Sequence, residues 1–229
     1  MGIDLSLPSI IIYALMVGIP LIAQSKIMSN YSKYKRVENK KRISGQEVAR
    51  KILDKNGLSN VHVVEVAGDL TDHYDPSRKV VRLSTDIFHG ETIAAASVAA
   101  HECGHAIQDK VGYKPMRVRS LLVLPVNLTS YLSWTIIVAG IFAQYFKLFA
   151  LGLGLFSITL VFQLVTLPVE FNASSRAKKE LNNLGLVDND EASGVSKMLG
   201  AAAMTYVASV LTNVLQILRF VLMFNNNKR

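Results

Sequence analysis

The chain has very little cysteine and two long stretches that lack charge altogether. Its 229 residues include a single cysteine, Cys103, which excludes an intrachain disulfide framework. Residues 120–146, and again residues 148–169, contain no Asp, Glu, Lys, Arg or His. A soluble domain of this size could not cover two such stretches on every side, so the missing charge indicates a membrane protein.

Four apolar stretches are expected to cross a membrane: residues 5–23, 120–146, 148–169 and 198–218. Each approaches the ~20 residues that a helix needs to cross a hydrocarbon core, where only a helix satisfies its own backbone. The first stretch is the weakest candidate, because it is short and contains Pro8 and Pro20. It lacks a basic leading segment and a clean cleavage site, so we expect a retained anchor and not a signal peptide.

Positive charge is concentrated directly after the first apolar stretch. The net charge is +8, and residues 25–42 hold seven Lys or Arg against one acid, Glu38. Beside a membrane span such a cluster is more typical of the cytoplasmic side than of nucleic-acid binding. We therefore expect residues 24–119 and 170–197 in the cytoplasm and both chain ends outside, with no nucleic-acid partner.

The region between the first two spans is expected to fold as a small α+β domain. Ser44 and Glu47 form a capping-box pattern that predicts a short amphipathic helix ending near Gly57. Strands are predicted near residues 61–66, 72–75 and 79–83, the last two as a β-hairpin. An alanine-rich helix follows over residues 92–109.

This last helix carries the sequence His101-Glu102-Cys103-Gly104-His105. Histidines four residues apart lie on one face of a helix, so both imidazoles can reach one Zn²⁺. Glu102 then lies beside the ion, where it can take a proton from water and pass it to the leaving amine. Cys103 is expected to be a packing residue that faces away from the metal. The motif predicts one zinc ion per chain.

A catalytic zinc normally keeps three protein ligands, and the sequence restricts the third. No histidine follows His105, and no acidic residue lies between Asp109 and Glu170. An extended metzincin motif would need a histidine at position 111, where Val111 stands. The remaining candidates are Glu170, Glu180, His73 and His89.

Glu170 is the best of these candidates. It stands where the third apolar stretch ends, a position at which a lone carboxylate is costly unless something pairs with it. The second stretch begins only fifteen residues after His105, so the helix that carries the motif lies close to the membrane. This helix and the span that ends at Glu170 can therefore meet near the same membrane interface. The alternative is a solvated residue at the end of a span.

Several longer motifs resemble the bacterial neutral zinc metallopeptidases of the YugP-like membrane protease family. The resemblance is collinear over nearly the whole chain and is carried by residues 70–76, 80–84, 98–108, 167–177 and 201–207. The family is in turn similar to the HtpX-type and CAAX-prenyl membrane metallopeptidases. Those enzymes have a glutamate ligand in a pattern that Glu170, Phe171 and Ala173 match. Ser174 stands where they have an aspartate that supports a histidine ligand, and a hydroxyl could do part of that work.

The resemblance implies a mainly α-helical integral membrane protein with four transmembrane helices and a zincin-like cytosolic domain. Its expected activity is hydrolysis of peptide bonds in polypeptides or membrane proteins, with Glu102 as general base and His101, His105 and Glu170 as zinc ligands. Analogy with the HtpX-type enzymes indicates membrane-protein quality control. Candidates for an oxyanion donor are Arg176, His73 and Tyr74.

Two other functions compete with this one. An intramembrane site-2-type protease would place an aspartate ligand in a later span, but the last three spans contain no aspartate. A catalytically silent membrane scaffold or partner-binding protein could retain the zinc site. It would have no need of Glu102, because a structural site requires no general base.

Overall fold

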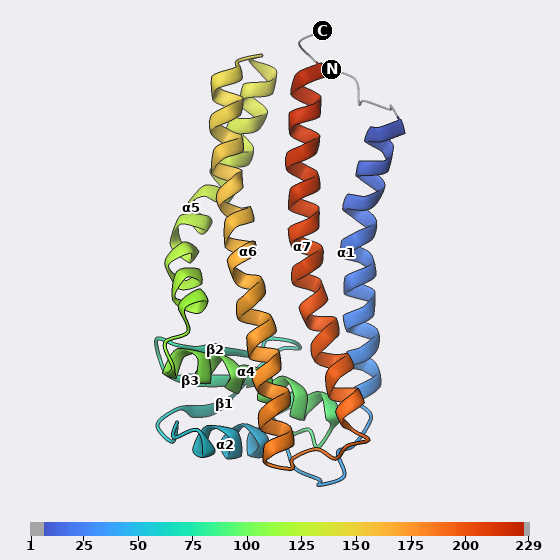
Figure 1. The fold of residues 1–229 in the computed structure, drawn as a ribbon, viewed down its shortest axis with the longest axis vertical. Helices are drawn as coiled ribbons and strands as arrows, with labels where there is room; N and C mark the ends of the chain where they lie inside the picture. The colour runs from blue at the N-terminus through green and yellow to red at the C-terminus, as the bar shows by residue number, and fades with distance from the viewer. Residues whose placement is uncertain (1–6, 227–229) are drawn as a thin grey trace. The chain divides into compact units, whose positions relative to one another are not determined.

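The computed structural model of the protein describes residues 7–226. Within them the chain forms seven helices and three strands (Figure 1). In chain order these are α1 (Leu7–Tyr34), α2 (Gly45–Lys55), β1 (His62–Val66), β2 (His73–Asp75), β3 (Val80–Ser84), α3 (Thr85–His89), α4 (Ile93–Lys110), α5 (Lys114–Phe142), α6 (Phe146–Asn183) and α7 (Ala192–Asn226). The expected outer position of both chain ends, and the first two residues of the first span, fall outside the described residues.

The chain divides into two compact units. The first, here called the helical unit, contains residues 7–24, Arg117–Leu167 and 205–226. The second, here called the sheet unit, contains Ser25–Met116 and Pro168–Met204. Helices α1, α6 and α7 contribute residues to both units, so the division follows packing and not the ends of these helices.

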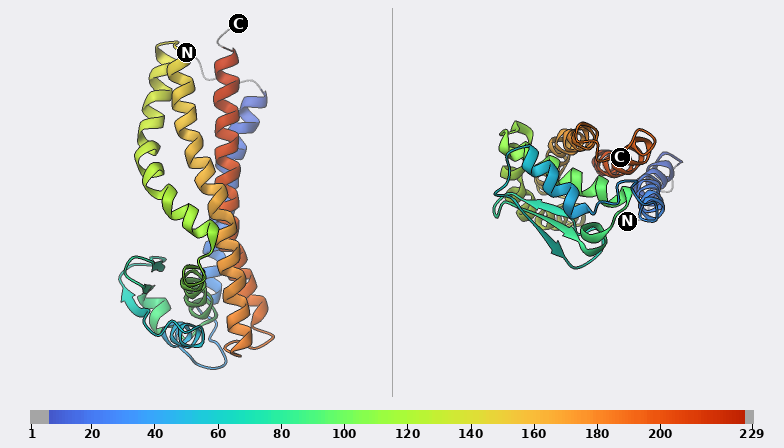
Figure 2. Two further views of the ribbon diagram at one scale, coloured as in Figure 1. Left: turned by 60° about the vertical axis from the view of Figure 1, so that its left-hand side comes forward. Right: turned by 90° about the horizontal axis from the view of Figure 1, so that it is seen from below.

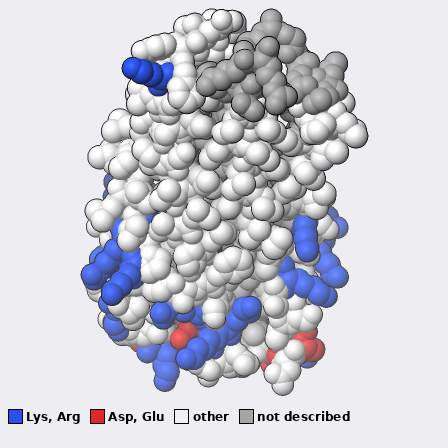
Figure 3. Space-filling view, turned by 45° about the horizontal axis from the view of Figure 1, so that its top comes forward, with Lys and Arg blue, Asp and Glu red and all other residues white. Residues whose placement is uncertain are grey.

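Helices α1, α5, α6 and α7 are each long and apolar enough to cross a membrane, as the sequence predicts. Their side chains show the reverse of a soluble protein, because large apolar residues point outwards. Leu121 is 76 % exposed and Phe142 is 79 % exposed. On the face drawn in Figure 3 a broad surface carries neither basic nor acidic side chains. Such a surface requires lipid around it, and the protein is therefore a membrane protein.

Inside the helical unit, α5 and α6 approach closely at two glycines. A Cβ built on Gly140 would lie 2.4 Å from the backbone nitrogen of Phe149, and one on Gly152 would lie 2.7 Å from that of Ile137. Small residues allow this kind of contact between membrane helices. Next to it, Phe220 of α7 contacts Trp134 with their ring centroids 5.5 Å apart. These helices are thus held together by close packing.

The four helices extend beyond the apolar stretches that predict them. Helix α1 runs on from residue 23 to Tyr34, and α6 runs on from residue 169 to Asn183. A helix does not need to end where the hydrocarbon ends, because its backbone hydrogen bonds are local. As a result, the polar ends of α1, α6 and α7 belong to the sheet unit.

In the sheet unit the strand order is β1-β3-β2. Strands β2 and β3 are antiparallel, with Tyr74 opposite Val81, which confirms the predicted hairpin. Strand β1 pairs with β3 in parallel, with Val64 opposite Arg82, so the central strand is the last in the chain. This parallel pairing and the short helix α3 are not predicted by the sequence.

Helices α2 and α4 pack against each other on the same side of the sheet (Figure 2). Helix α2 begins with the predicted capping box, in which Ser44 and Glu47 bond each other's backbone nitrogens. Gly57 has a φ of +62°, a conformation that favours glycine and ends the segment. The core includes side chains of α2 and β3 that are fully buried: Val48, Ile52, Leu53, Val81 and Leu83.

Candidate metal centre

Helix α4 positions both histidines of the motif. It begins at Thr92, whose hydroxyl caps the first turn by accepting from the nitrogen of Ala95, and it ends before Gly112, which has a φ of +63°. Most of its residues are small and buried, so neighbouring elements lie close to its backbone on several sides. The rings of His101 and His105 project from one face, with their centroids 4.8 Å apart.

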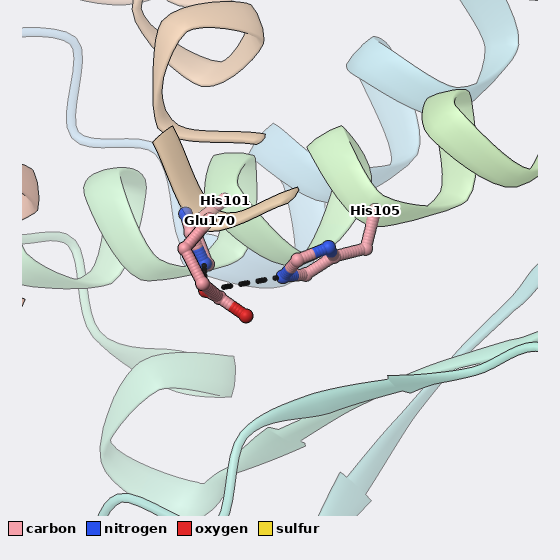
Figure 4. A group of neighbouring side chains, drawn as sticks. All are labelled: His101, His105 and Glu170. Atoms are coloured by element: carbon pink, nitrogen blue, oxygen red, sulfur yellow. Dashed lines mark hydrogen bonds and ion pairs between the residues drawn. The ribbon is translucent and has the colours of Figure 1, made fainter. Parts of the chain in front are cut away.

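Helix α6 brings Glu170 to the same place, as Figure 4 shows. The approach depends on Gly104, which lies between the two histidines in the sequence. A Cβ built on Gly104 would lie only 2.6 Å from the carbonyl oxygen of Ala173, one turn after Glu170. No real Cβ occupies that position, so the contact between α4 and α6 requires glycine at 104.

The geometry of this group suits a zinc ion. Oε2 of Glu170 lies 3.3 Å from Nε2 of His101 and 3.7 Å from Nε2 of His105. Ligand atoms bound tetrahedrally at about 2.0–2.1 Å from zinc are separated by about 3.3 Å, close to both distances. Two neutral imidazoles and one carboxylate are also a common donor set for zinc enzymes. Among the described residues this is the one group of His, Cys, Asp and Glu side chains that could hold a metal ion.

The electrostatics of the centre favour a cation as well. Burial alone lowers the pKa of His105, but the hydrogen bond with Glu170 and the charge of Glu102 outweigh it, so the pKa is raised above the ordinary 6.5. The three residues of this group are largely buried, with only 15 % of the His101 side chain exposed. Negative charge in such surroundings attracts a proton or a metal ion strongly.

The outer nitrogens of both imidazoles also have partners. Nδ1 of His101 lies 3.2 Å from the hydroxyl of Ser174, on the turn of α6 after Glu170. Nδ1 of His105 lies 3.0 Å from Oε1 of Gln108. Such contacts orient metal-binding histidines and direct Nε2 to the ion. Ser174 therefore occupies the position at which the related enzymes have an aspartate, and its hydroxyl contacts Nδ1 of His101 there.

The other sequence candidates lie elsewhere or have other partners. Nε2 of His89 bonds Glu65 at 3.1 Å, and Nδ1 of His73 lies 2.7 Å from the carbonyl oxygen of Thr71. Neither histidine belongs to the metal-binding group, and neither does Glu180. Glu102 is buried and is not a member of that group.

All three candidates for an oxyanion donor have hydrogen bonds to other groups, His73 through its contact with Thr71. The hydroxyl of Tyr74 donates to Asp109 at 2.7 Å, and burial together with this bond raises the pKa of Tyr74. Nε of Arg176 donates to the side-chain oxygen of Asn172 at 2.8 Å. Gln108 and Asn172 are the residues near the centre that sequence reasoning missed. Their one signal in the sequence is position, since Gln108 is three residues after His105 on the same helix face.

Comparisons with known proteins agree with this geometry. The sequence pattern of a family described as "Putative neutral zinc metallopeptidase" matches residues 9–225. The chain is 46 % identical over 211 residues to the "Putative membrane protease YugP" of Bacillus subtilis (strain 168). The aligned residues make up 92 % of this chain and 94 % of that protein. No solved structure matches the chain.

Proposed function

Because the chain belongs to the neutral zinc metallopeptidase family, we propose that it is a membrane-embedded endopeptidase with Glu102 as its general base. In this proposal His101, His105 and Glu170 hold the catalytic zinc ion. One observation carries it: three ligand atoms from two helices lie within 4.8 Å of one another, and the helix that supplies two of them also carries Glu102.

The proposed reaction adds water across a peptide bond. Zinc, when bound, supplies a Lewis acid that makes water more acidic and polarises the scissile carbonyl group. Glu102 takes one proton from the attacking water as its oxygen bonds the carbonyl carbon. The carbon–nitrogen bond then breaks, and Glu102 gives this proton to the leaving amine and recovers its charge.

The position of Glu102 suits it for this work. Its residue is only 8 % exposed, and its charge contributes to the raised pKa of His105, so its carboxylate lies close to the metal-binding side chains. A structural zinc site gains nothing from a buried carboxylate that is not a ligand.

The edge of the sheet offers a place for an extended substrate. Strand β2 is the outer strand on one side of the sheet, and Tyr74 fixes it to α4 through the bond with Asp109. An edge strand has unpaired backbone groups that can bond an extended peptide. We propose that the substrate binds along β2 and presents its scissile bond to α4.

We further propose that the centre faces the cytoplasm of a bacterial cell and serves membrane-protein quality control. The basic residues 26–42 support this orientation, since Lys and Arg in short loops stay on the cytoplasmic side. Polypeptides with segments in or near the bilayer are then the accessible substrates. The quality-control role follows from analogy with the HtpX-type enzymes.

Replacement of Glu102 by Gln tests the catalytic proposal. The purified full-length protein, loaded with zinc, would be assayed with fluorescently labelled casein beside Glu180→Gln, a matched change on α6 outside the metal-binding group. We expect Glu102→Gln to keep its zinc and to lose at least about 100-fold in turnover, the usual contribution of a general base. Wild-type turnover in this variant would refute the proposed base. The scaffold alternative predicts two other results. The zinc-loaded wild-type protein would show no activity, and Glu102→Gln would still complement a strain from which the gene is deleted.

A further inference from the structure

A chain of hydrogen bonds connects Arg176 of α6 to His105 of α4. Nε of Arg176 donates to Oδ1 of Asn172 at 2.8 Å, and Nε2 of Gln108 donates to the same oxygen at 3.0 Å. At its other end, Oε1 of Gln108 lies 3.0 Å from Nδ1 of His105. Gln108 is fully buried, so water cannot replace these bonds. All four residues belong to the sheet unit.

Two of the groups in this series of hydrogen bonds can play only one role, either donor or acceptor. A guanidinium group only donates, so the atom of Asn172 that faces Arg176 must be its oxygen. A backbone carbonyl only accepts, and Nε2 of Gln108 also lies 2.7 Å from the carbonyl oxygen of Val169. The nitrogen of the Gln108 amide must therefore face α6, and its oxygen must face His105. The orientation of both amides follows from these partners alone.

This orientation determines which nitrogen of His105 carries a proton. Oε1 of Gln108 can only accept, so Nδ1 of His105 has to donate to it. In a neutral imidazole the other nitrogen, Nε2, then has a free lone pair. Nε2 lies 3.7 Å from Oε2 of Glu170, so its lone pair is available to a cation held between the two residues. The ring is thus prepared for a cation before any cation arrives.

We propose that Gln108, Asn172 and Arg176 are positioning residues that fix His105 with its proton on Nδ1 and so prepare Nε2 to bind zinc. The inference deepens the proposed function, because it rests on His105 as a zinc ligand. It also gives Arg176 a role other than that of an oxyanion donor. The residues act through one another and do not touch the ion.

This chain of hydrogen bonds from Arg176 to His105 is here called the relay. Its residues need different hydrogen-bonding groups, so substitutions can remove one group at a time. Gln108→Met keeps the size of the side chain and removes both hydrogen-bonding groups. Asn172→Leu removes the acceptor, whereas Asn172→Asp keeps an acceptor for both Gln108 and Arg176, because a carboxylate only accepts. Gln46→Met is a matched control, since Gln46 is exposed on α2. A role in packing alone would not distinguish Asn172→Asp from Asn172→Leu in this way.

The first measurement is the zinc affinity of the full-length protein in detergent, by competition with a chelator. We expect Gln108→Met to weaken zinc binding about 10–100-fold, the usual effect of losing such a partner. Asn172→Leu should also weaken binding, while Asn172→Asp and Gln46→Met stay close to wild type. Wild-type affinity in Gln108→Met, or equal losses in Asn172→Asp and Asn172→Leu, would overturn the proposal.

The second measurement needs no zinc. Nitrogen-15 spectra of labelled histidine in the metal-free protein should show Nδ1 of His105 protonated from pH 6 to pH 9. In Gln108→Met the neutral ring should move its proton to Nε2, which faces Glu170. An unprotonated Nδ1 of His105 in the wild-type protein would overturn the proposal. Because this result does not depend on zinc, a protein that binds no zinc would refute the proposed function and still test the relay.

Discussion

The Cα of Gly104 on α4 faces the carbonyl oxygen of Ala173 on α6 so closely that a Cβ at position 104 would lie 2.6 Å from that oxygen. The backbone of one helix thus serves as the surface on which the other rests. Glu170 reaches the two histidines because no side chain separates the helices at this point.

Gly104→Ala should therefore damage the metal centre without touching a ligand. The added methyl group has to push α6 away, which costs about 1–3 kcal/mol of unfolding free energy, as overpacking usually does. We expect a lower melting temperature and weaker zinc binding. Gly200→Ala is the matched control, because a Cβ at Gly200 on α7 meets nothing within 4 Å. Equal zinc affinity in the two variants would show that the contact does not position Glu170.

Glu170→Ala should remove the third ligand. The two histidines alone would bind zinc more weakly by more than about 100-fold, beyond the effect of losing an outer partner. Elemental analysis after dialysis should find close to one zinc per wild-type chain and much less in the variant. Glu180→Ala, further along the same helix, should keep its zinc. Undiminished zinc in Glu170→Ala would mean that another group is the third ligand.

Ser174 offers a graded test of the contact with Nδ1 of His101. Ser174→Ala removes the partner and should weaken zinc binding by up to about 10-fold. Ser174→Asp should strengthen binding, because a carboxylate makes the imidazole a more basic ligand. Chelator competition would measure both. Weaker binding in Ser174→Asp than in Ser174→Ala would show that this position cannot hold a charged partner.

As the pH is lowered, zinc affinity should begin to fall at a higher pH than it would at a site whose histidines have ordinary pKa values. Zinc needs His105 unprotonated. Burial lowers the pKa of His105, but the hydrogen bond with Glu170 and the charges of Glu102 and Glu170 together outweigh burial and raise this pKa above 6.5 in the metal-free protein. Protons therefore compete with zinc as the pH falls through this raised pKa. The same contact stabilises the metal-free fold below pH 6.5 and loses that effect as the pH rises through the folded-state pKa.

Chelator competition between pH 5.5 and pH 8.5 would record this dependence. The Glu170→Gln variant supplies the comparison, since a neutral amide no longer raises the pKa of His105. Although it binds zinc more weakly at every pH, its affinity should stay level down to a lower pH than that of the wild type. Parallel curves for the two proteins would contradict the coupling between His105 and Glu170.

The proposed orientation can be tested with single cysteines. The natural cysteine, Cys103, is fully buried, and burial raises the pKa of its thiol, so it should not react with maleimides. Lys41→Cys and Lys147→Cys place exposed thiols after the first span and between the second and third. In intact cells a membrane-impermeant maleimide should label Lys147→Cys, and Lys41→Cys only after permeabilisation. The opposite pattern would place the metal centre outside the cell.

Much of the centre could be predicted because its signals are local. The spacing of His101 and His105 needs only helical geometry, and the capping box at Ser44 needs only four residues. Glu170 could be singled out because so few acids follow the motif. The β2–β3 hairpin likewise depends on neighbouring segments, and the structure confirms it.

The features that escaped prediction depend on contacts between distant segments. The parallel pairing of β1 with β3 brings together strands separated by the whole of β2. The bonds of Gln108 to Val169 and Asn172 join residues more than sixty positions apart. A sequence shows that Gln108 lies on the face of His105, but it does not show what the packing of α6 places opposite its amide.

The separation between the proposed ligands along the chain also affects how the protein is made. His101 precedes Glu170 by 69 positions, and the third apolar stretch lies between the two. A ribosome therefore completes the membrane-crossing part of α6 before it adds Glu170. A nascent chain has its two imidazoles early and its carboxylate late, so under the proposed function an unfinished copy lacks its third zinc ligand.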